Sequence, residues 1–442
     1  MGKQVESYDA MYHRCPMHRR PLSLRGLLLA VLVLATLSGP ARGQLPPPTL
    51  DDAQSSAARD LPAADALSDR TAVWVITLGL GDQPHTLFGH TAVVVRDPTL
   101  AFSVAFNYGT FAFGDGFLLQ FLGGRLDYHL SVTDGWMPLR EAMRSGRGHI
   151  RQRLDLTPTQ SRMLYRELRR EAQPEHREYR YRFLDRNCST KVIDVLERAL
   201  GDALQWPSSE VDDADETDAH PATYRELLRG HLRDRPWYRL GIDLMLGRPT
   251  DRHATGRRRG FLPIHLAQLL DGTLVQSGGA ARPLVSHREA EAFRGLPETT
   301  RRTPLWAALS LLALGFVSTA TARWKPAAMR WPMRIFDGLL LLGTGLAGLA
   351  IAGMWAFSAH GVIGPNANLL WAVPLHLVAA AWVIQRPAQK WLRIYLAVAA
   401  VLATGVTLAW PWIPQGMPTA LWPVAGLIAV RCTHRAAAPQ QS

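Results

Sequence analysis

The sequence predicts an α+β domain outside the cytoplasm, followed by a C-terminal bundle of about five transmembrane helices. Three observations lead to this fold class: an apolar segment near the N-terminus, a charged middle region with alternating strand-like and helix-like patterns, and a C-terminal third with few charges. The chain has 442 residues, of which 47% are hydrophobic, and only three cysteines. This composition suffices for two or three domains with cores, and it excludes a disordered chain and a disulfide scaffold.

Residues 1–44 are expected to be a signal peptide or an N-terminal membrane anchor. A basic stretch precedes an apolar run at 26–38, and the small residues after it suit cleavage by a signal peptidase. The sequence does not decide whether this segment is cleaved off, or whether translation starts at Met17 instead of Met1. No cysteine follows the run, so it is not a lipoprotein signal, and the Pro-, Ala- and Asp-rich residues 45–69 are expected to be a linker.

Residues 70–300 are expected to form the exported α+β domain. Its β-branched runs of strand length predict strands at 71–80, 89–97 and 100–109. Thr157 opens a capping box with proline at the first helical position, which predicts a helix there. A second helix is expected to start at Cys188, after Asn187 as its N-cap, and to stop at Gly201.

Residues 301–431 are expected to form the membrane bundle, with 432–442 as a cytoplasmic tail. The five apolar stretches are about 304–322, 335–357, 367–384, 393–413 and 417–430. The first four are long enough to span a bilayer. Lys and Arg lie in alternate loops, whereas the loops 358–366 and 414–416 contain none. The positive-inside rule then predicts a multi-pass inner-membrane protein with a cytoplasmic C-terminus and residues 45–300 on the periplasmic side.

The formal net charge of +12 does not by itself indicate a nucleic-acid partner. A basic balance in a chain of this kind more often reflects Arg-rich loops that fix membrane orientation than contacts to phosphates. We therefore expect the lipid bilayer as a partner and no nucleic acid.

Cys188 is the candidate nucleophile. It is the only cysteine of the exported region, because Cys15 precedes the apolar run of the signal and Cys432 lies in the expected tail. At the first turn of a helix, the dipole and the free N–H groups favour a thiolate and can hold an oxyanion. The alternative is a buried, inert cysteine that acts as a small hydrophobe.

His90 is the candidate base for this thiol, because it opens an apolar strand where the interior meets a cleft. The alternative is a histidine at the sheet edge that a local partner satisfies. If Asp97 starts a hairpin turn, residues near 105–107 lie opposite His90. Asn107 or Tyr108 is then the candidate group that orients the imidazole.

Metal chemistry is not expected. His85 and His90 are five residues apart in a loop, without a zinc motif or a cysteine pair, so we expect neither a metal nor another cofactor. Phe111, Phe113, Phe117 and Phe121 could line an acyl-chain groove or belong to the core.

Several polar residues are candidates for substrate binding. Arg182 and Asn187 flank the approach to Cys188, and the arginines of this region could bind anionic headgroups or pair with nearby acids. His360, Asn366 and Asn368 surround the charge-free loop between two membrane stretches. There they either face a substrate or are ordinary loop residues.

Several segments together resemble the N-terminal periplasmic domain of the Lnb family, the lipoprotein intramolecular transacylases. The segments are Phe88-Gly89-His90-Thr91-Ala92, Phe106-Asn107-Tyr108-Gly109-Thr110-Phe111, Arg180-Tyr181-Arg182-Phe183, Asn187-Cys188-Ser189-Thr190, and further on 241–247, 251–252 and 261–263. The similarity spans about residues 70–290. The order of a strand histidine and then a helix-start cysteine is also similar to the circularly permuted papain-like fold of the NlpC and lecithin:retinol acyltransferase types.

This resemblance implies that Cys188 is the nucleophile and His90 the base. It also implies an acyl transfer through a Cys thioester on a membrane phospholipid or a diacylglyceryl lipoprotein, with an ester-linked chain moving to the amine of the N-terminal cysteine. Because one fold hosts several chemistries, two alternatives remain. One is a cell-envelope thiol amidase or peptidase of the NlpC type, and the other is a non-catalytic envelope-binding module.

Overall fold

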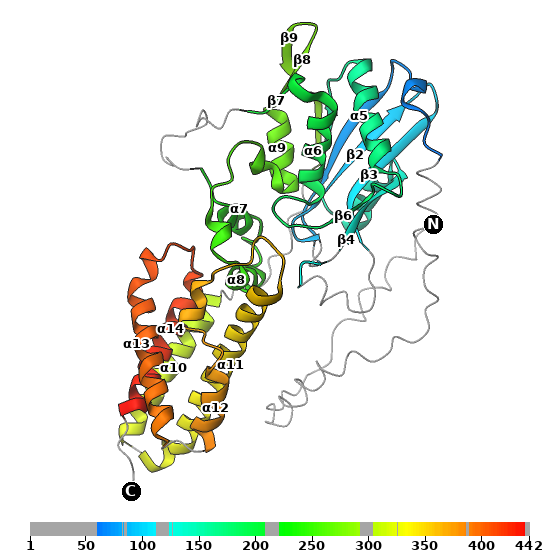
Figure 1. Cartoon of the computed structure of the whole chain (residues 1–442). Coiled ribbons are helices and arrows are strands. Elements are labelled where there is room, and N and C mark those ends of the chain that lie inside the picture. The colour runs from blue at the N-terminus through cyan, green and yellow to red at the C-terminus, as the bar shows by residue number, and fades with distance from the viewer. Residues whose placement is uncertain are drawn as a thin grey trace, which may run out of the picture. The chain divides into compact units, whose positions relative to one another are not determined.

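The computed structural model describes residues 60–81, 83, 86–111, 123–125, 127–207, 221–291, 304–324, 326–385 and 389–437 (Figure 1). By its contacts the chain divides into two units, Met1–Asp52 and Ala53–Ser442, and every described residue belongs to the second. The expected signal segment, Cys15, His85 and the phenylalanines 113, 117 and 121 lie outside the described residues.

A seven-stranded sheet forms the centre of the region 60–291, which we call the sheet domain. Its strand order is β10-β5-β1-β2-β3-β4-β6, and all neighbouring pairs are antiparallel. The strands are β1 (Ala72–Leu78), β2 (His90–Asp97), β3 (Phe102–Thr110), β4 (Asp127–Asp134), β5 (His149–Leu154), β6 (Glu178–Arg180) and β10 (Val285–Glu291). A second sheet contains β7 (Leu204–Gln205), β8 (Leu274–Ser277) and β9 (Ala280–Pro283). The three strands expected from the sequence are confirmed.

Helices cover both faces of the large sheet. The helices of the sheet domain are α4 (Met137–Ser145), α5 (Pro158–Glu171), α6 (Cys188–Leu200), α7 (Tyr224–His231), α8 (Pro236–Met245) and α9 (Pro263–Asp271). Helices α5, α6 and α9 lie on one face of the sheet (Figure 1), and their apolar side chains form the main core there, whereas α4 packs against the other face. The two helices predicted from their caps are confirmed as α5, with its capping box at Thr157, and α6.

Strand alternation assigns the side chains of β2 to these two cores. Val93 and Val95 belong to the main core beneath α5 and α6, whereas Val94 belongs to the smaller core beneath α4. Because successive side chains of a strand point to opposite faces, His90 shares the α4 side with Val94, and Thr91 shares the α6 side with Val93. The start of β2 therefore presents one residue to each face.

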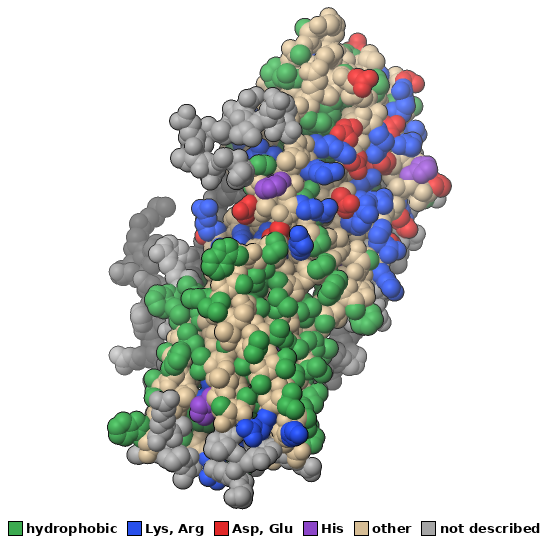
Figure 2. All heavy atoms as spheres, turned by 60° about the vertical axis from the view of Figure 1, so that its left-hand side comes forward, with side chains coloured by type: hydrophobic (Ala, Val, Ile, Leu, Met, Phe, Trp, Pro, Cys, Tyr) green, Lys and Arg blue, Asp and Glu red, His purple; other side chains and the backbone are tan. Residues whose placement is uncertain are grey.

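The C-terminal region forms a helical bundle. Its helices are α10 (Pro304–Trp324), α11 (Pro326–Phe357), α12 (His376–Gln385), α13 (Lys390–Ala409) and α14 (Trp422–Ala437). Three segments are long and apolar enough to cross a membrane: Pro304–Thr321, Ala328–Phe357 and Lys390–Trp412. Figure 2 shows hydrophobic side chains gathered over these helices and charged side chains gathered over the sheet domain.

The expectation that the third apolar stretch forms one spanning helix is wrong. Residues Ala367–Leu370 form a 3-10 turn, and α12 begins only at His376 and has ten residues. Pro374 lies between the two elements, and a proline disfavours helical geometry in the residue before it. Apolar composition alone therefore overestimated the length of this helix.

Candidate active site

Cys188 occupies the first position of α6, and Asn187 caps that helix. The Asn187 side-chain oxygen accepts hydrogen bonds from the N–H groups of Ser189 at 2.9 Å and Thr190 at 3.0 Å. Its amide nitrogen donates to the carbonyls of Phe183 at 2.7 Å and Phe261 at 2.9 Å. The predicted N-cap is confirmed. Because Asn187 is buried and its polar atoms hold the chain around Cys188, the expectation that it binds substrate is corrected.

Polar groups of β2 and α6 surround the Cys188 thiol and affect its pKa. Burial raises the pKa of Cys188, while the backbone N–H of Thr91, the hydroxyl and N–H of Ser189 and the cysteine's own N–H lower it. Burial outweighs the donors, so the net pKa is raised. The expectation of a thiolate, which rested on the helix start alone, is thus corrected: Cys188 is a neutral thiol at rest. The nearby N–H groups can stabilise a negative charge when one forms.

Thr91 and Gly109 bring the sheet to this thiol. The recorded pairing of β2 with β3 ends at Ala92 and Asn107, one residue short of Thr91, whose N–H faces the sulfur. Gly109 adopts a φ of +94°, and a Cβ built on it would lie 3.7 Å from the Cys188 Cβ. A backbone with this φ favours glycine, so β3 can turn beside Cys188.

His90 and Asn107 form the second half of the site. Burial and the positive charge of Arg147 lower the pKa of His90 to about 4, while a side-chain hydrogen bond with Asn107 raises it. Asn107 is itself anchored, because its amide nitrogen donates to the Thr133 hydroxyl at 3.0 Å. The imidazole is therefore neutral at neutral pH, the form that can accept a proton. Its neighbour Thr91 directs its N–H at the thiol, so both predicted residues lie at the start of β2, with the His90 side chain on the α4 side of the sheet and Cys188 on the α6 side.

Tyr108 is not beside His90, which corrects the expectation that it orients the imidazole. Its hydroxyl donates to the Glu171 carboxylate at 2.6 Å, and its side chain is 1% exposed in the main core. Glu171 also pairs with Lys191 and Arg198. Tyr108 points away from Asn107 because neighbouring residues of a strand face opposite sides. Of the two candidates, Asn107 makes the contact.

Three tyrosines around Cys188 were not predicted. Tyr128, Tyr179 and Tyr181 are each coupled electrostatically to Cys188, and burial raises the pKa of all three. The rings of Tyr128 and Tyr181 stack with centroids 4.3 Å apart. Tyr179 and Tyr181 are two residues apart in the sequence. This spacing, which places two side chains on one face of a strand, was the signal in the sequence that could have predicted their shared position. They give the thiol a predominantly aromatic, water-poor surrounding.

Comparison with protein families identifies both regions of the chain. Residues 62–230 match the Lnb N-terminal periplasmic domain, and residues 297–441 match the Lnb transmembrane domain. The chain belongs to the Lnb family. Searches of the curated proteins and of the solved structures gave no match. The two Lnb domains describe a membrane protein with an extracytoplasmic part, from a family of lipoprotein-processing enzymes.

Several arginines of the sheet domain have local acidic partners. Arg182 is exposed and forms an ion pair with Asp185 at 3.0 Å, and Arg180 contacts Asp127 at 2.7 Å. Arg257 contacts Glu197 at 2.6 Å. These pairs agree with the simpler of the two interpretations.

Asn366 and Asn368 bind the chain itself, which corrects the expectation that they face a substrate. Both are buried, and the Asn366 amide donates to the Leu244 carbonyl at 2.9 Å. Its oxygen accepts from Asn368 at 2.9 Å and from Gln415 at 3.1 Å. Their amide groups are thus used to connect the end of α8 with loops of the Lnb transmembrane domain.

His360 lies in the same set of loop contacts. The N–H of Ala359 donates to the Gly123 carbonyl at 2.9 Å, and a Cβ on Gly124 would lie 2.7 Å from the backbone nitrogen of His360. Further along, Gly247 donates to the Val362 carbonyl at 3.0 Å. We call the contacts of residues 123–124 and 225–251 with the loops 358–370 and 413–417 the junction.

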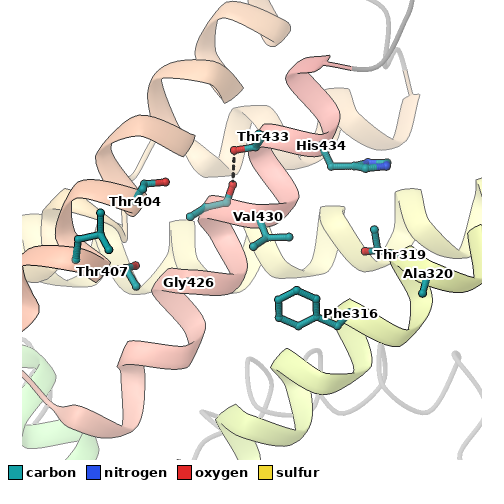
Figure 3. Close-up of a pocket in the computed structure, with 11 residues that line it drawn as sticks. Phe316, Thr319, Ala320, Thr404, Thr407, Gly426, Val430, Thr433 and His434 are labelled. Atoms are coloured by element: carbon teal, nitrogen blue, oxygen red, sulfur yellow. Dashed lines mark hydrogen bonds between the residues drawn. The ribbon is translucent and has the colours of Figure 1, made fainter. Parts of the chain in front are cut away.

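A groove of about 690 Å³ lies between α10, α13 and α14, away from Cys188 (Figure 3). Three of its threonine hydroxyls donate to carbonyls of their own helices: Thr319 to Gly315, Thr407 to Ala403 and Thr433 to Ala429. The lining therefore offers mainly apolar surface. In the described part of the chain, no group of three His, Cys, Asp or Glu residues could hold a metal ion.

Proposed function

We propose that this protein transfers an acyl chain within a diacylglyceryl lipoprotein through a thioester on Cys188. One observation carries the proposal. The thiol lies at a capped helix start, an N–H from β2 points at its sulfur, and the preceding residue of β2 is a neutral histidine held by Asn107. These are a nucleophile, an oxyanion donor and a base, which acyl transfer requires.

In the first step, the Cys188 sulfur attacks the ester carbonyl of the lipid while His90, whose ring has to reach the sulfur past the start of β2, takes the thiol proton. The C–O bond of the ester breaks, and the leaving alcohol receives that proton from His90. In the second step, the free amine of the lipoprotein attacks the thioester, the C–S bond breaks, and Cys188 regains a proton by way of His90. The products are an N-acylated lyso-lipoprotein and the original enzyme.

Neutral resting states suit this sequence of steps. Because the thiol pKa is raised and the imidazole pKa is lowered, the proton leaves sulfur only as the carbonyl accepts the electron pair. The N–H of Thr91 and those at the start of α6 then stabilise the negative charge. Asn107 holds the His90 ring in the orientation that receives the proton.

We further propose the permuted papain-like fold for the sheet domain and an inner-membrane location with a cytoplasmic C-terminus. The chain order supports the fold, because the strand with His90 precedes the helix that begins at Cys188. The loops that reach the sheet domain at the junction are those without Lys or Arg, which supports the orientation. Cells would then carry out the reaction where ester and amine both lie at the bilayer surface, a gain in proximity.

The test is mass spectrometry of lipoprotein N-termini after incubation of vesicles that contain a diacylglyceryl lipopeptide with the purified full chain. The wild type and the Cys432→Ala control should yield N-acylated lyso product, while Cys188→Ala and His90→Gln should yield none. A thioester on Cys188 should accumulate when the lipopeptide amine is blocked. Unchanged lipopeptide with the wild type would refute the proposal. In a parallel incubation with cell-wall peptides, their cleavage would favour the amidase alternative.

A further inference from the structure

Exposed aromatic residues lie at both ends of the membrane helices. At one end of the bundle are Trp306 near the start of α10, Trp355 near the end of α11, Trp412 after α13 and Trp422 at the start of α14, with 48–79% of each side chain exposed. At the other end are Trp324, Trp331 and Trp391, with 40–87% exposed. Tryptophan prefers the headgroup region of a bilayer, so these two sets mark its two surfaces.

The first set lies at the same end as the junction. Trp355 is four residues before the Ala359 N–H that contacts Gly123, and Trp412 is four residues before Gly416. Gly416 in turn donates to Asp251 at 2.9 Å and accepts from Arg229 at 2.8 Å. The sheet domain is therefore fastened at the level of one membrane surface.

Helix α8 of the sheet domain reaches this level. It contacts α10 and α11, and its Leu244 packs against the core of the bundle. On its inner side Asp243 is buried, with Arg225 at 2.8 Å and Arg229 at 2.7 Å. These contacts fix which side of α8 faces the protein.

The first turn of α8 carries two exposed aromatic side chains. Trp237 and Tyr238 are 55% and 46% exposed, and the neighbouring Arg239 is exposed as well. Large aromatic side chains in water are unfavourable, but this combination with an arginine suits the boundary between acyl chains and headgroups. Because α8 contacts α10 and α11, these side chains lie on the helix that connects the sheet domain to the bundle.

We propose that α8 lies in the membrane interface and places Trp237 and Tyr238 among the lipids of the leaflet next to the junction. The partner is the bilayer itself, at the depth of its headgroups and upper acyl chains. The sheet domain is then held to the membrane by its own helix as well as by the spanning helices, which sets its distance from lipid substrates. This inference does not depend on the proposed chemistry at Cys188.

The test measures the depth of nitroxide labels in the full chain reconstituted in phosphatidylcholine–phosphatidylglycerol vesicles. Labels are attached at Trp237→Cys or Tyr238→Cys in a background that carries Cys15→Ser, Cys188→Ser and Cys432→Ser. Trp306→Cys provides the reference for the interface, and Met143→Cys, which is 67% exposed on α4, provides the reference for water.

Labels at 237 and 238 should collide more with oxygen than with a water-soluble nickel chelate, as should the label at 306. The label at 143 should show the reverse, so that the depth parameter changes sign between the two groups. A label at 237 and at 238 that behaves like the one at 143 would overturn the proposal. An aqueous signal at 306 would overturn it too, because the aromatic set would then not mark a membrane surface.

Discussion

Replacement of Arg225 by methionine tests whether the junction depends on one buried guanidinium. The Arg225 side chain is 1% exposed and makes six hydrogen bonds: with the Asp243 carboxylate and carbonyl, with both oxygens of Asp251, and with the carbonyls of Leu246 and Gly247. Methionine fills much of the volume but supplies no donor. The substitution therefore removes charge and hydrogen bonds together while it keeps most of the packing.

The loss follows from the partners that remain. Asp243 keeps Arg229 at 2.7 Å, whereas Asp251 retains only the Gly416 N–H at 2.9 Å and stays largely buried. Breaking a buried pair from one side costs about 3–5 kcal/mol. For a domain of this size, that loss corresponds to a decrease in Tm of about 6–20 °C.

The assay is thermal unfolding of the purified full chain in detergent, followed by tryptophan fluorescence at a fixed scan rate. Arg229→Met is the matched control. Its side chain is 23% exposed and Asp243 keeps Arg225, so we expect a loss of roughly 1–2 kcal/mol. If Arg225→Met lowered Tm no more than Arg229→Met, the assignment of Arg225 as the centre of the junction would be refuted.

Two further predictions concern the site. The His90 pKa is lowered from 6.5 to about 4. Between pH 6.5 and about pH 4, His90 is therefore protonated in the unfolded chain but neutral in the folded chain. Stability should then fall by up to about 3 kcal/mol as pH decreases from 7 to 4, and His90→Gln should flatten this dependence in denaturant unfolding. Gly109→Ala forces alanine to a φ of +94° and should lower stability by about 1–2 kcal/mol and slow acyl transfer. Gly201→Ala, at a φ of +53° with open space around it, should cost less; equal losses would contradict the reasoning.

Local signals were enough to predict the elements that carry the site. The capping residues of α5 and α6 lie within four positions of the helix starts, and both helices begin where those caps predict. The turn after Asp97 likewise set the approximate pairing of β2 with β3. The choice between Asn107 and Tyr108 could not follow from this, because an error of one residue in register moves a side chain to the opposite face.

Other features depend on residues far apart in the sequence. The pKa of Cys188 is raised because the tyrosines of β4 and β6 and their neighbours enclose it, and no motif at the helix start reports that burial. Asn366 and Asn368 lie in a polar, charge-free loop that looked suited to binding a substrate. Their side-chain amides instead donate hydrogen bonds to the Leu244 carbonyl, about 120 residues earlier in the chain. Polar residues near a membrane surface satisfy distant backbone groups as readily as ligands.

The protonation states of Cys188 and His90 suggest how an unpaired cysteine outside the cytoplasm can avoid oxidation. Oxidants and disulfides react with the thiolate, and burial keeps Cys188 in the thiol form at rest. The donors from Thr91 and Ser189 do not overcome this burial until a carbonyl oxygen begins to carry negative charge beside them. His90 remains neutral and ready to accept the proton at that moment. The same burial that weakens the resting nucleophile would therefore protect it and confine its reactivity to a bound ester.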